Sequence, residues 1–146
     1  GGTEDDVTVE ERDAFFTDPA EAERFARETG VDALAVAVGT AHGPYKWEPK
    51  LDYPRLRKIR ESVDASIVLH GSSGVPDEAI RQAVALGVTK INIDTEIRQA
   101  FVRAAVAYMQ ENPDNIDPRK MLGPGKEAAK KVIREKMRLF GCSGKA

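Results

Sequence analysis

The segment 65–74 reads ASIVLHGSSG, an apolar run that ends in a histidine and a glycine-rich loop. An earlier segment, 31–43, reads VDALAVAVGTAHG, and its first part, 31–38, is an apolar run that leads through glycine to a histidine. Short apolar runs of this kind predict buried parallel strands, and one amphipathic helical pattern separates the two. Consecutive parallel strands end at one edge of a sheet. Both histidines are therefore predicted at the carboxyl edge, where α/β folds place their chemistry.

Helical and strand patterns alternate outward from these segments. Helices are predicted from Asp18-Pro19 to Thr29-Gly30, from about Tyr53-Pro54, from Pro76 to Gly87, from about Glu96 to Gln110 and from about Gly125 to Phe140. A third strand is predicted over 89–93, which reads TKINI. Three parallel strands cannot close a barrel, and an open sheet of three leaves two edges unpaired. The chain is therefore predicted to form part of a larger α/β sheet.

Composition limits the class of protein. A length of 146 residues with 41% hydrophobic residues fits one domain with a modest core. A net charge of -2 does not give the basic footprint of a nucleic-acid-binding protein. No apolar run approaches the roughly 20 residues of a membrane span, and the single cysteine, Cys142, indicates a reducing compartment. We expect a soluble cytoplasmic protein without nucleic-acid or membrane partners.

Backbone N–H groups that could bind an anion follow the second and third predicted strands. Residues 71–74 form a glycine-serine loop, and residues 92–95 lead directly into a predicted helix. Backbone N–H groups in such a loop or at a helix N-terminus favour phosphate, so we expect both segments to share one anion site. A plain turn and an N-cap explain the same residues, and both interpretations stay open.

His42 and His70 also allow two interpretations. A lone histidine is more often structural than a metal ligand, whereas two on one edge beside a phosphate loop favour a metal site. Catalytic zinc takes three protein ligands and keeps one position open for substrate. With two histidines available, the third ligand is expected to be a carboxylate or a residue outside this sequence.

Three ordered motifs carry a family resemblance. They read AVAVGTAHGPYK at 35–46, VLHGSSGVP at 68–76 and KINIDTE at 90–96, and the likeness extends from GGTEDD at 1–6 to DPRK at 117–120 and RLFG at 138–141. Together they closely resemble the C-terminal half of the class II, zinc-dependent fructose-1,6-bisphosphate aldolases. The resemblance covers essentially the whole chain.

The resemblance implies the second half of a (β/α)8 TIM barrel with parallel strands and C-terminal helices. Residues 1–146 would be the C-terminal part of a single TIM-barrel domain, and residues 1–17 a mobile active-site loop. The implied activity is reversible cleavage of fructose 1,6-bisphosphate to dihydroxyacetone phosphate and glyceraldehyde 3-phosphate through a zinc-stabilised enediolate, in glycolysis and gluconeogenesis. The alternatives are a tagatose-bisphosphate aldolase and a non-catalytic phosphate-binding half-barrel. Asp94 favours fructose bisphosphate, because tagatose relatives often carry alanine there.

The resemblance also assigns roles to individual residues. It implies zinc ligation by His42 and His70, proton transfer by Glu4, and a monovalent cation near Lys46. The residues implied in binding the phosphorylated sugar substrate are Gly43, Gly71, Ser72, Ser73, Asn92, Ile93, Asp94, Thr95 and, for the second phosphate, Arg119. The family's third zinc histidine lies upstream of Gly1. We therefore expect the isolated chain to be inactive without the missing N-terminal half, and the full-length protein to be a homo-oligomer.

Overall fold

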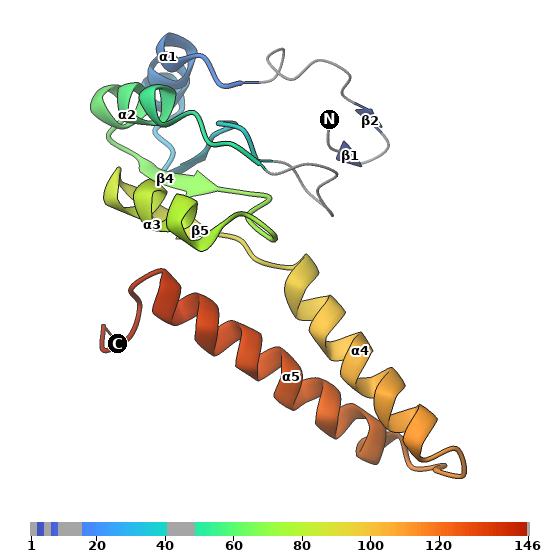
Figure 1. Ribbon diagram of the computed structural model, residues 1–146. Helices are drawn as coiled ribbons and strands as arrows, with labels where there is room; N and C mark the ends of the chain where they lie inside the picture. Colours follow the sequence, from blue (N-terminus) through green and yellow to red (C-terminus); the bar gives the residue numbers. More distant parts are fainter. Residues whose placement is uncertain (1–2, 5–6, 9–15, 41–48, 146) are drawn as a thin grey trace. The chain divides into compact units, whose positions relative to one another are not determined.

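The computed structural model describes residues 3–4, 7–8, 16–40 and 49–145. Its elements fall into two compact units, residues 1–93 and residues 94–146 (Figure 1). None of the described helices is both long enough and apolar enough to cross a lipid bilayer.

The first unit alternates strands and helices. In chain order these are β1 (Thr3–Glu4), β2 (Val7–Thr8), α1 (Pro19–Thr29), β3 (Ala33–Ala35), α2 (Tyr53–Ser62), β4 (Ser66–Leu69), α3 (Asp77–Ala85) and β5 (Val88–Ile91). The strands β3, β4 and β5 form a parallel sheet in that order, while β1 and β2 pair antiparallel with each other. The predicted α/β architecture with parallel strands is confirmed.

Helix α1 begins and ends where its sequence signals predict. Both the Ala20 and the Glu21 N–H groups donate to Asp18 Oδ1, at 2.9 and 3.0 Å. Pro19 occupies the first turn, and Gly30 ends the helix in the left-handed conformation with φ of 65°. Caps of this kind satisfy backbone groups that the helix leaves unpaired at its ends.

The core of the first unit is built around β4. Ile67, Val68 and Leu69 are all buried, so both faces of this strand are covered, as expected for the central strand of a parallel sheet. The helices α2 and α3 contribute the fully buried Leu56, Ile59 and Ile80. This packing holds the carboxyl end of β4 in a fixed place.

Two strand boundaries differ from the prediction. The first strand was expected over 31–38 but is assigned only to Ala33–Ala35. The third begins at Val88 and ends at Ile91 rather than covering 89–93, and its register with β4 shifts between Ile67 and Val68. A run of apolar residues identifies a strand, but it does not show at which residue the hydrogen bonds to the neighbouring strand stop.

The second unit is a helical hairpin of α4 (Thr95–Glu111) and α5 (Pro118–Leu139), which lie side by side in Figure 1. The prediction that the last helix starts near Gly125 is wrong. Asp117 caps the helix by accepting from the Arg119 N–H at 3.0 Å, and Pro118 occupies the first turn. Gly125 lies inside the helix. Its lack of a side chain makes room for the ring of Phe101.

Candidate active site

His70 and Asn92 meet at the carboxyl end of the sheet. His70 directly follows β4, and its Nε2 lies 3.2 Å from Asn92 Nδ2, just beyond the end of β5. The Asn92 backbone N–H donates to the Leu69 carbonyl at 3.1 Å, which extends the pairing of the two strands. The sheet therefore holds an imidazole and a side-chain amide within hydrogen-bonding distance, and the Asn92 Nδ2–H group donates to His70 Nε2 in the tautomer that leaves this nitrogen unprotonated.

The glycine-serine loop after His70 folds tightly back on itself. Gly71 and Gly74 have positive φ angles of 61° and 82°, which a residue with a Cβ rarely adopts. Ser72 is almost completely buried, and its Oγ donates to the His70 carbonyl at 3.5 Å. The Val75 N–H donates to the Ser72 carbonyl at 3.4 Å. The loop thus follows the strand without a flexible spacer and leads into α3.

The remaining predicted substrate contacts fall on both units. Asn92 and Ile93 close the first unit, whereas Asp94 and Thr95 open the second at the start of α4. The exposed Asp94 carboxylate accepts from Arg98 Nε at 2.7 Å. Asp94 makes no side-chain cap bond to α4.

Arg119 is engaged by its neighbour Asp117. Its Nε and Nη2 donate to the two Asp117 carboxylate oxygens, both at 3.0 Å. This bidentate pairing lowers the pKa of the Asp117 carboxyl and raises the pKa of the Arg119 guanidinium. Since the Arg119 side chain is 88% exposed, the guanidinium can exchange this partner for another anion.

Several predicted residues are only partly covered by the structure. His42, Gly43 and Lys46 lie outside the described residues, and Glu4 is described only as a backbone position in β1, opposite Val7. The predicted convergence of His42 with His70 therefore stays a prediction.

The chain on either side of residues 41–48 is held at the carboxyl end of β3. The Asp52 N–H donates to the Val38 carbonyl at 2.8 Å. Gly39 has a φ of 108°, and a Cβ there would collide with the Lys50 carbonyl oxygen. Gly39 and Lys50, on either side of residues 41–48, therefore lie next to each other.

The sequence reasoning missed a polar cluster beside this point. Arg55 Nε donates to Asp52 Oδ2 at 3.0 Å, Arg55 Nη1 donates to the Thr17 carbonyl at 3.1 Å, and the guanidinium lies 5.2 Å from the centre of the Phe16 ring. The Arg55 backbone N–H, with smaller help from its side chain, lowers the pKa of Asp52 against the opposing effect of burial. An aspartate three residues before an arginine at a predicted helix start was the available signal.

The described residues supply part of a metal site at most. Among them, no group of three or more histidine, cysteine, aspartate or glutamate side chains converges as a metal site would require. His70 contributes the kind of nitrogen that zinc accepts, and its contact with Asn92 restrains the ring. A complete zinc site would need donors from beyond these residues.

Comparison with known proteins adds a family and a set of structures. The family described as class II fructose-bisphosphate aldolase matches residues 1–145. The YdjI aldolase from Escherichia coli K12 is 40% identical with a TM-score of 0.77, and the match covers 90% of this chain and 48% of that one.

Two further solved structures give the same result. A putative fructose-1,6-bisphosphate aldolase from Coccidioides immitis is 29% identical, with a TM-score of 0.76 and coverage of 89% and 45%. The fructose-bisphosphate aldolase from Campylobacter jejuni is 26% identical, with a TM-score of 0.75 and coverage of 97% and 50%. The chain spans about half the length of each of these three proteins.

Proposed function

The chain belongs to the class II fructose-bisphosphate aldolase family, and on that premise we propose that it forms half of an enzyme that reversibly cleaves fructose 1,6-bisphosphate. The products are dihydroxyacetone phosphate and glyceraldehyde 3-phosphate, as in glycolysis and gluconeogenesis. The observation that carries the proposal is the pairing of His70 with Asn92 at the carboxyl end of β4 and β5, next to the loop of Gly71, Ser72 and Ser73. Ligand sites in parallel α/β folds lie at this end of the sheet.

The proposed cofactor is zinc, held by His70, by His42 and by a third ligand from the half of the enzyme that residues 1–146 do not include. When bound, zinc would polarise the substrate carbonyl and stabilise the negative charge of the enediolate. His70 follows a strand that is buried on both faces, so its backbone is fixed before any metal arrives. Asn92 would limit rotation of the imidazole, which is the usual role of a second residue behind a metal ligand.

The phosphate of dihydroxyacetone phosphate is proposed to bind at the loop over 71–73 and at residues 92–95. The left-handed backbone at Gly71 turns the loop sharply after His70, and backbone N–H groups in a loop of this kind favour an anion. Anchoring the phosphate would hold the reacting carbons at a fixed distance from His70, so that binding energy is used for orientation. Gly43 is proposed to complete this site.

The other assignments extend the same proposal. Glu4 would transfer the proton to or from the reacting carbon of the substrate. Arg119 would contact the second phosphate, and a monovalent cation would bind near Lys46. Arg119 supports this role because its guanidinium already holds a bidentate carboxylate, and a phosphate presents the same geometry. We further propose that the full-length enzyme is a cytoplasmic homo-oligomer, and that residues 1–146 alone lack aldolase activity.

The test uses the complete aldolase, in which residues 1–146 are joined to their other half. Wild-type protein should cleave fructose 1,6-bisphosphate and lose activity to a chelator. His70→Ala should abolish both cleavage and tight zinc binding. Asn92→Ala should lower zinc affinity by about 10- to 100-fold. Lys90→Ala, at an exposed position of β5, is the matched control and should leave both unchanged.

The outcomes separate the remaining alternatives. Cleavage that survives both chelation and His70→Ala would overturn the zinc proposal. A preference for tagatose 1,6-bisphosphate over fructose 1,6-bisphosphate would replace the proposed substrate. Phosphate binding without any cleavage by the complete protein would favour a non-catalytic phosphate-binding barrel.

A further inference from the structure

Two hydrogen bonds join Thr17 to the chain just beyond β3. The Thr17 N–H donates to the Ala37 carbonyl at 2.9 Å, and the Ala37 N–H donates to Thr17 Oγ1 at 2.8 Å. Ala37 follows shortly after the end of β3, and Thr17 directly precedes Asp18, the N-cap of α1. The start of α1 and the carboxyl end of β3 are therefore bonded in both directions.

Arg55 connects Thr17 to the start of α2. Its Nη1 donates to the Thr17 carbonyl at 3.1 Å, and its Nε donates to Asp52 Oδ2 at 3.0 Å. The Asp52 N–H in turn donates to the Val38 carbonyl at 2.8 Å. These contacts form a closed circuit, the β3 clamp, whose members are Thr17, Ala37, Val38, Asp52 and Arg55.

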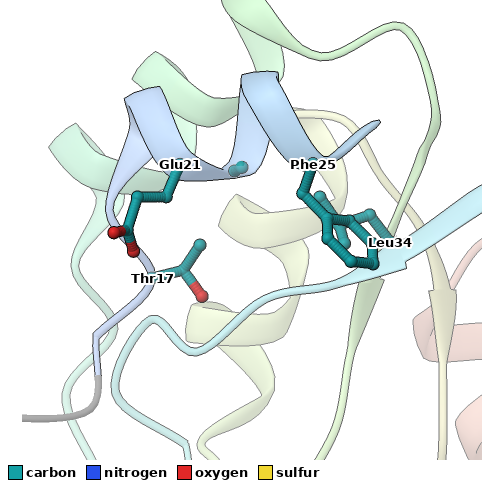
Figure 2. A pocket seen from close by; sticks show the side chains of 5 residues that line it. Thr17, Glu21, Phe25 and Leu34 are labelled. Atoms are coloured by element: carbon teal, nitrogen blue, oxygen red, sulfur yellow. The ribbon is translucent and has the colours of Figure 1, made fainter. Parts of the chain in front are cut away.

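Thr17 depends on these polar contacts for its position. On one side it borders a hollow of about 230 Å³, whose lining residues are Thr17, Glu21, Ala22, Phe25 and Leu34. Figure 2 shows Glu21 with Thr17 at one end of the hollow, and Phe25 with Leu34 at the other. Side-chain packing therefore does not enclose Thr17 on this side, and the hydrogen bond from Arg55 to its carbonyl supplies part of the missing restraint.

A helix cap alone does not require this arrangement. Asp52 caps α2 by accepting from the Arg55 backbone N–H at 2.9 Å, and the guanidinium takes no part in that bond. In the hairpin, Asp117 and Arg119 make the same kind of cap and ion pair within the first turn of α5, with the Arg119 side chain 88% exposed. The Arg55 side chain is 31% exposed and reaches a carbonyl 38 residues away in the sequence. Arg55 therefore joins distant segments in addition to pairing with the cap.

The β3 clamp lies at the edge of the sheet that carries the candidate site. The Val36 N–H donates to the Val68 carbonyl at 3.2 Å, so the chain at the end of β3 stays aligned with β4. His70 directly follows β4. Because parallel strands end at one edge, the clamp and His70 share the carboxyl edge, where α/β folds place their chemistry.

We propose that Arg55 is a positioning residue for aldol cleavage. By holding Thr17 and Asp52 against the end of β3, it fixes the points from which the chain continues toward Glu4 in one direction and toward His42 in the other. Arg55 itself touches neither substrate nor metal. The inference rests on the proposed function, because Glu4 and His42 have their catalytic and zinc-binding roles only there.

The position of the clamp in the sequence determines which property it affects. Val38 precedes His42 by four residues, so a displaced Val38 would make His42 a poorer partner for His70 on one zinc ion. A misplacement of about 1 Å costs up to about 100-fold in rate. The proposed phosphate contacts at 71–73 and 92–95 are not members of the clamp. Loss of Arg55 should therefore lower kcat and zinc affinity and change KM little.

The kinetic experiment uses the complete aldolase, with residues 1–146 joined to their other half. Arg55→Met removes both side-chain hydrogen bonds and should lower kcat by about 10- to 100-fold and zinc affinity by about tenfold. Arg55→Lys keeps a positive charge near the Phe16 ring but lacks the planar fork, so it should recover only part of this loss. Arg57→Met is the matched control on an exposed position of the same helix, and it should leave both properties unchanged.

Amide exchange gives a readout that does not depend on activity. In the Arg55→Met protein the Ala37 amide should exchange about tenfold faster, because the Thr17 hydroxyl that accepts its N–H is less restrained. The amides of Ile67 and Leu69 in the buried strand β4 should exchange as in the wild type. This difference separates a local displacement at β3 from a general loss of stability.

Three results would overturn the inference. One is an Arg55→Met protein whose kcat and zinc affinity match those of Arg57→Met. Another is unchanged exchange of the Ala37 amide. The third is equally faster exchange of the β4 amides, which would assign Arg55 to overall stability alone. Cleavage that survives His70→Ala would instead overturn the proposed zinc chemistry, and exchange of the Ala37 amide would still decide whether Arg55 holds the end of β3.

Discussion

The α/β unit and the helical hairpin bury their side chains to different degrees. In the α/β unit, Leu56, Ile59 and Leu69 have no exposed surface. Among the described residues of the hairpin, the buried positions are Ala105 and Gly125, while Val102 is 56% exposed. The α/β unit is therefore stabilised by contacts between distant parts of the sequence, and the hairpin depends more on local helix signals.

The same difference applies to the proposed site residues. His70 and Ser72 follow a strand that is buried over 67–69, and they are held by the Ser72 Oγ bond to the His70 carbonyl and by the contact of the His70 ring with Asn92. Asp94 and Arg119 lie on the hairpin surface, where their partners are charged neighbours a few residues away. Rigid support is what a metal ligand requires, and an adaptable guanidinium such as that of Arg119 is suited to a phosphate.

The largest effect expected on stability comes from truncating the same residue type in the two units. Ile67→Ala removes a fully buried side chain from β4 and should lower the free energy of unfolding by about 2–5 kcal/mol. Ile133→Ala acts on a side chain that is 41% exposed on α5 and should cost at most about 1 kcal/mol. Urea denaturation followed by circular dichroism measures both. Equal losses would show that the hairpin has a core as tight as that of the sheet.

Two glycines of α5 should respond in opposite directions. An added Cβ at Gly125 would lie 2.9 Å from the Phe101 ring, so Gly125→Ala should destabilise the hairpin by about 1–2 kcal/mol as the ring is displaced. Gly123→Ala meets no atom within 4 Å and should stabilise the helix by up to about 1 kcal/mol. Thermal denaturation of the two variants provides the comparison. Stabilisation by both would mean that Phe101 moves aside without loss of packing.

Local sequence signals predicted the ends of helices correctly where the interactions that form those ends involve residues next to each other in the sequence. Asp18, Pro19 and Gly30 bound α1 in the sequence as they do in the structure. The error at α5 arose because residues 118–124 were left out of the predicted helix, whereas the contact of Gly125 with Phe101 across the hairpin explains why a glycine lies inside it. That contact joins residues far apart in the chain, and no periodic pattern reveals it.

The candidate site was predictable to a similar extent. The position of His70 after β4 follows from the apolar run before it, and parallel strands bring Asn92 to the same edge. The Asp52 and Arg55 pair was missed because its third contact, the Thr17 carbonyl, is a backbone atom with no sequence signature. Whether a glycine-serine turn binds phosphate likewise depends on the direction of its N–H groups. The amino-acid composition of the turn does not specify that direction.

The N-cap residues Asp52 and Asp117 are similarly accessible, but their arginine partners differ, since the Arg55 side chain is 31% exposed and the Arg119 side chain 88%. Asp52→Ala should lower stability at pH 7 by about 1 kcal/mol, because the side chain accepts from the Arg55 backbone N–H and pairs with its guanidinium. Asn caps a helix as well as Asp does, so Asp52→Asn isolates the contribution of charge. Urea titrations over a range of pH measure both variants.

The pH dependence has a definite sign. The pKa of Asp52 is lower in the folded protein, so its charge stabilises the fold fully above the unfolded pKa of about 3.9. This contribution is lost as the pH falls through the folded pKa, and the Asp52→Asn protein should then match the wild type. Asp117→Asn should show the same direction with a smaller amplitude, since the Arg119 side chain that lowers the pKa of Asp117 is exposed to solvent. A difference that grows with acidity would contradict this assignment.

The smallest effect is expected from two ion pairs within the hairpin. Lys136 Nζ lies 2.8 Å from Glu96 Oε2, with side chains only 16% and 28% exposed, and this pair joins α5 to α4. Arg98 and Asp94 are 78% and 66% exposed and lie at one helix.

A double-mutant cycle with Glu96→Gln and Lys136→Gln should give a coupling energy of about 0.5–1 kcal/mol. The cycle with Asp94→Asn and Arg98→Gln should give no measurable coupling, because water and salt screen an exposed pair and Asp94 makes no cap bond to α4. Exchange of the α4 and α5 amides reports hairpin opening directly. A larger coupling for the exposed pair would mean that the surface of the hairpin is more ordered than its exposure indicates.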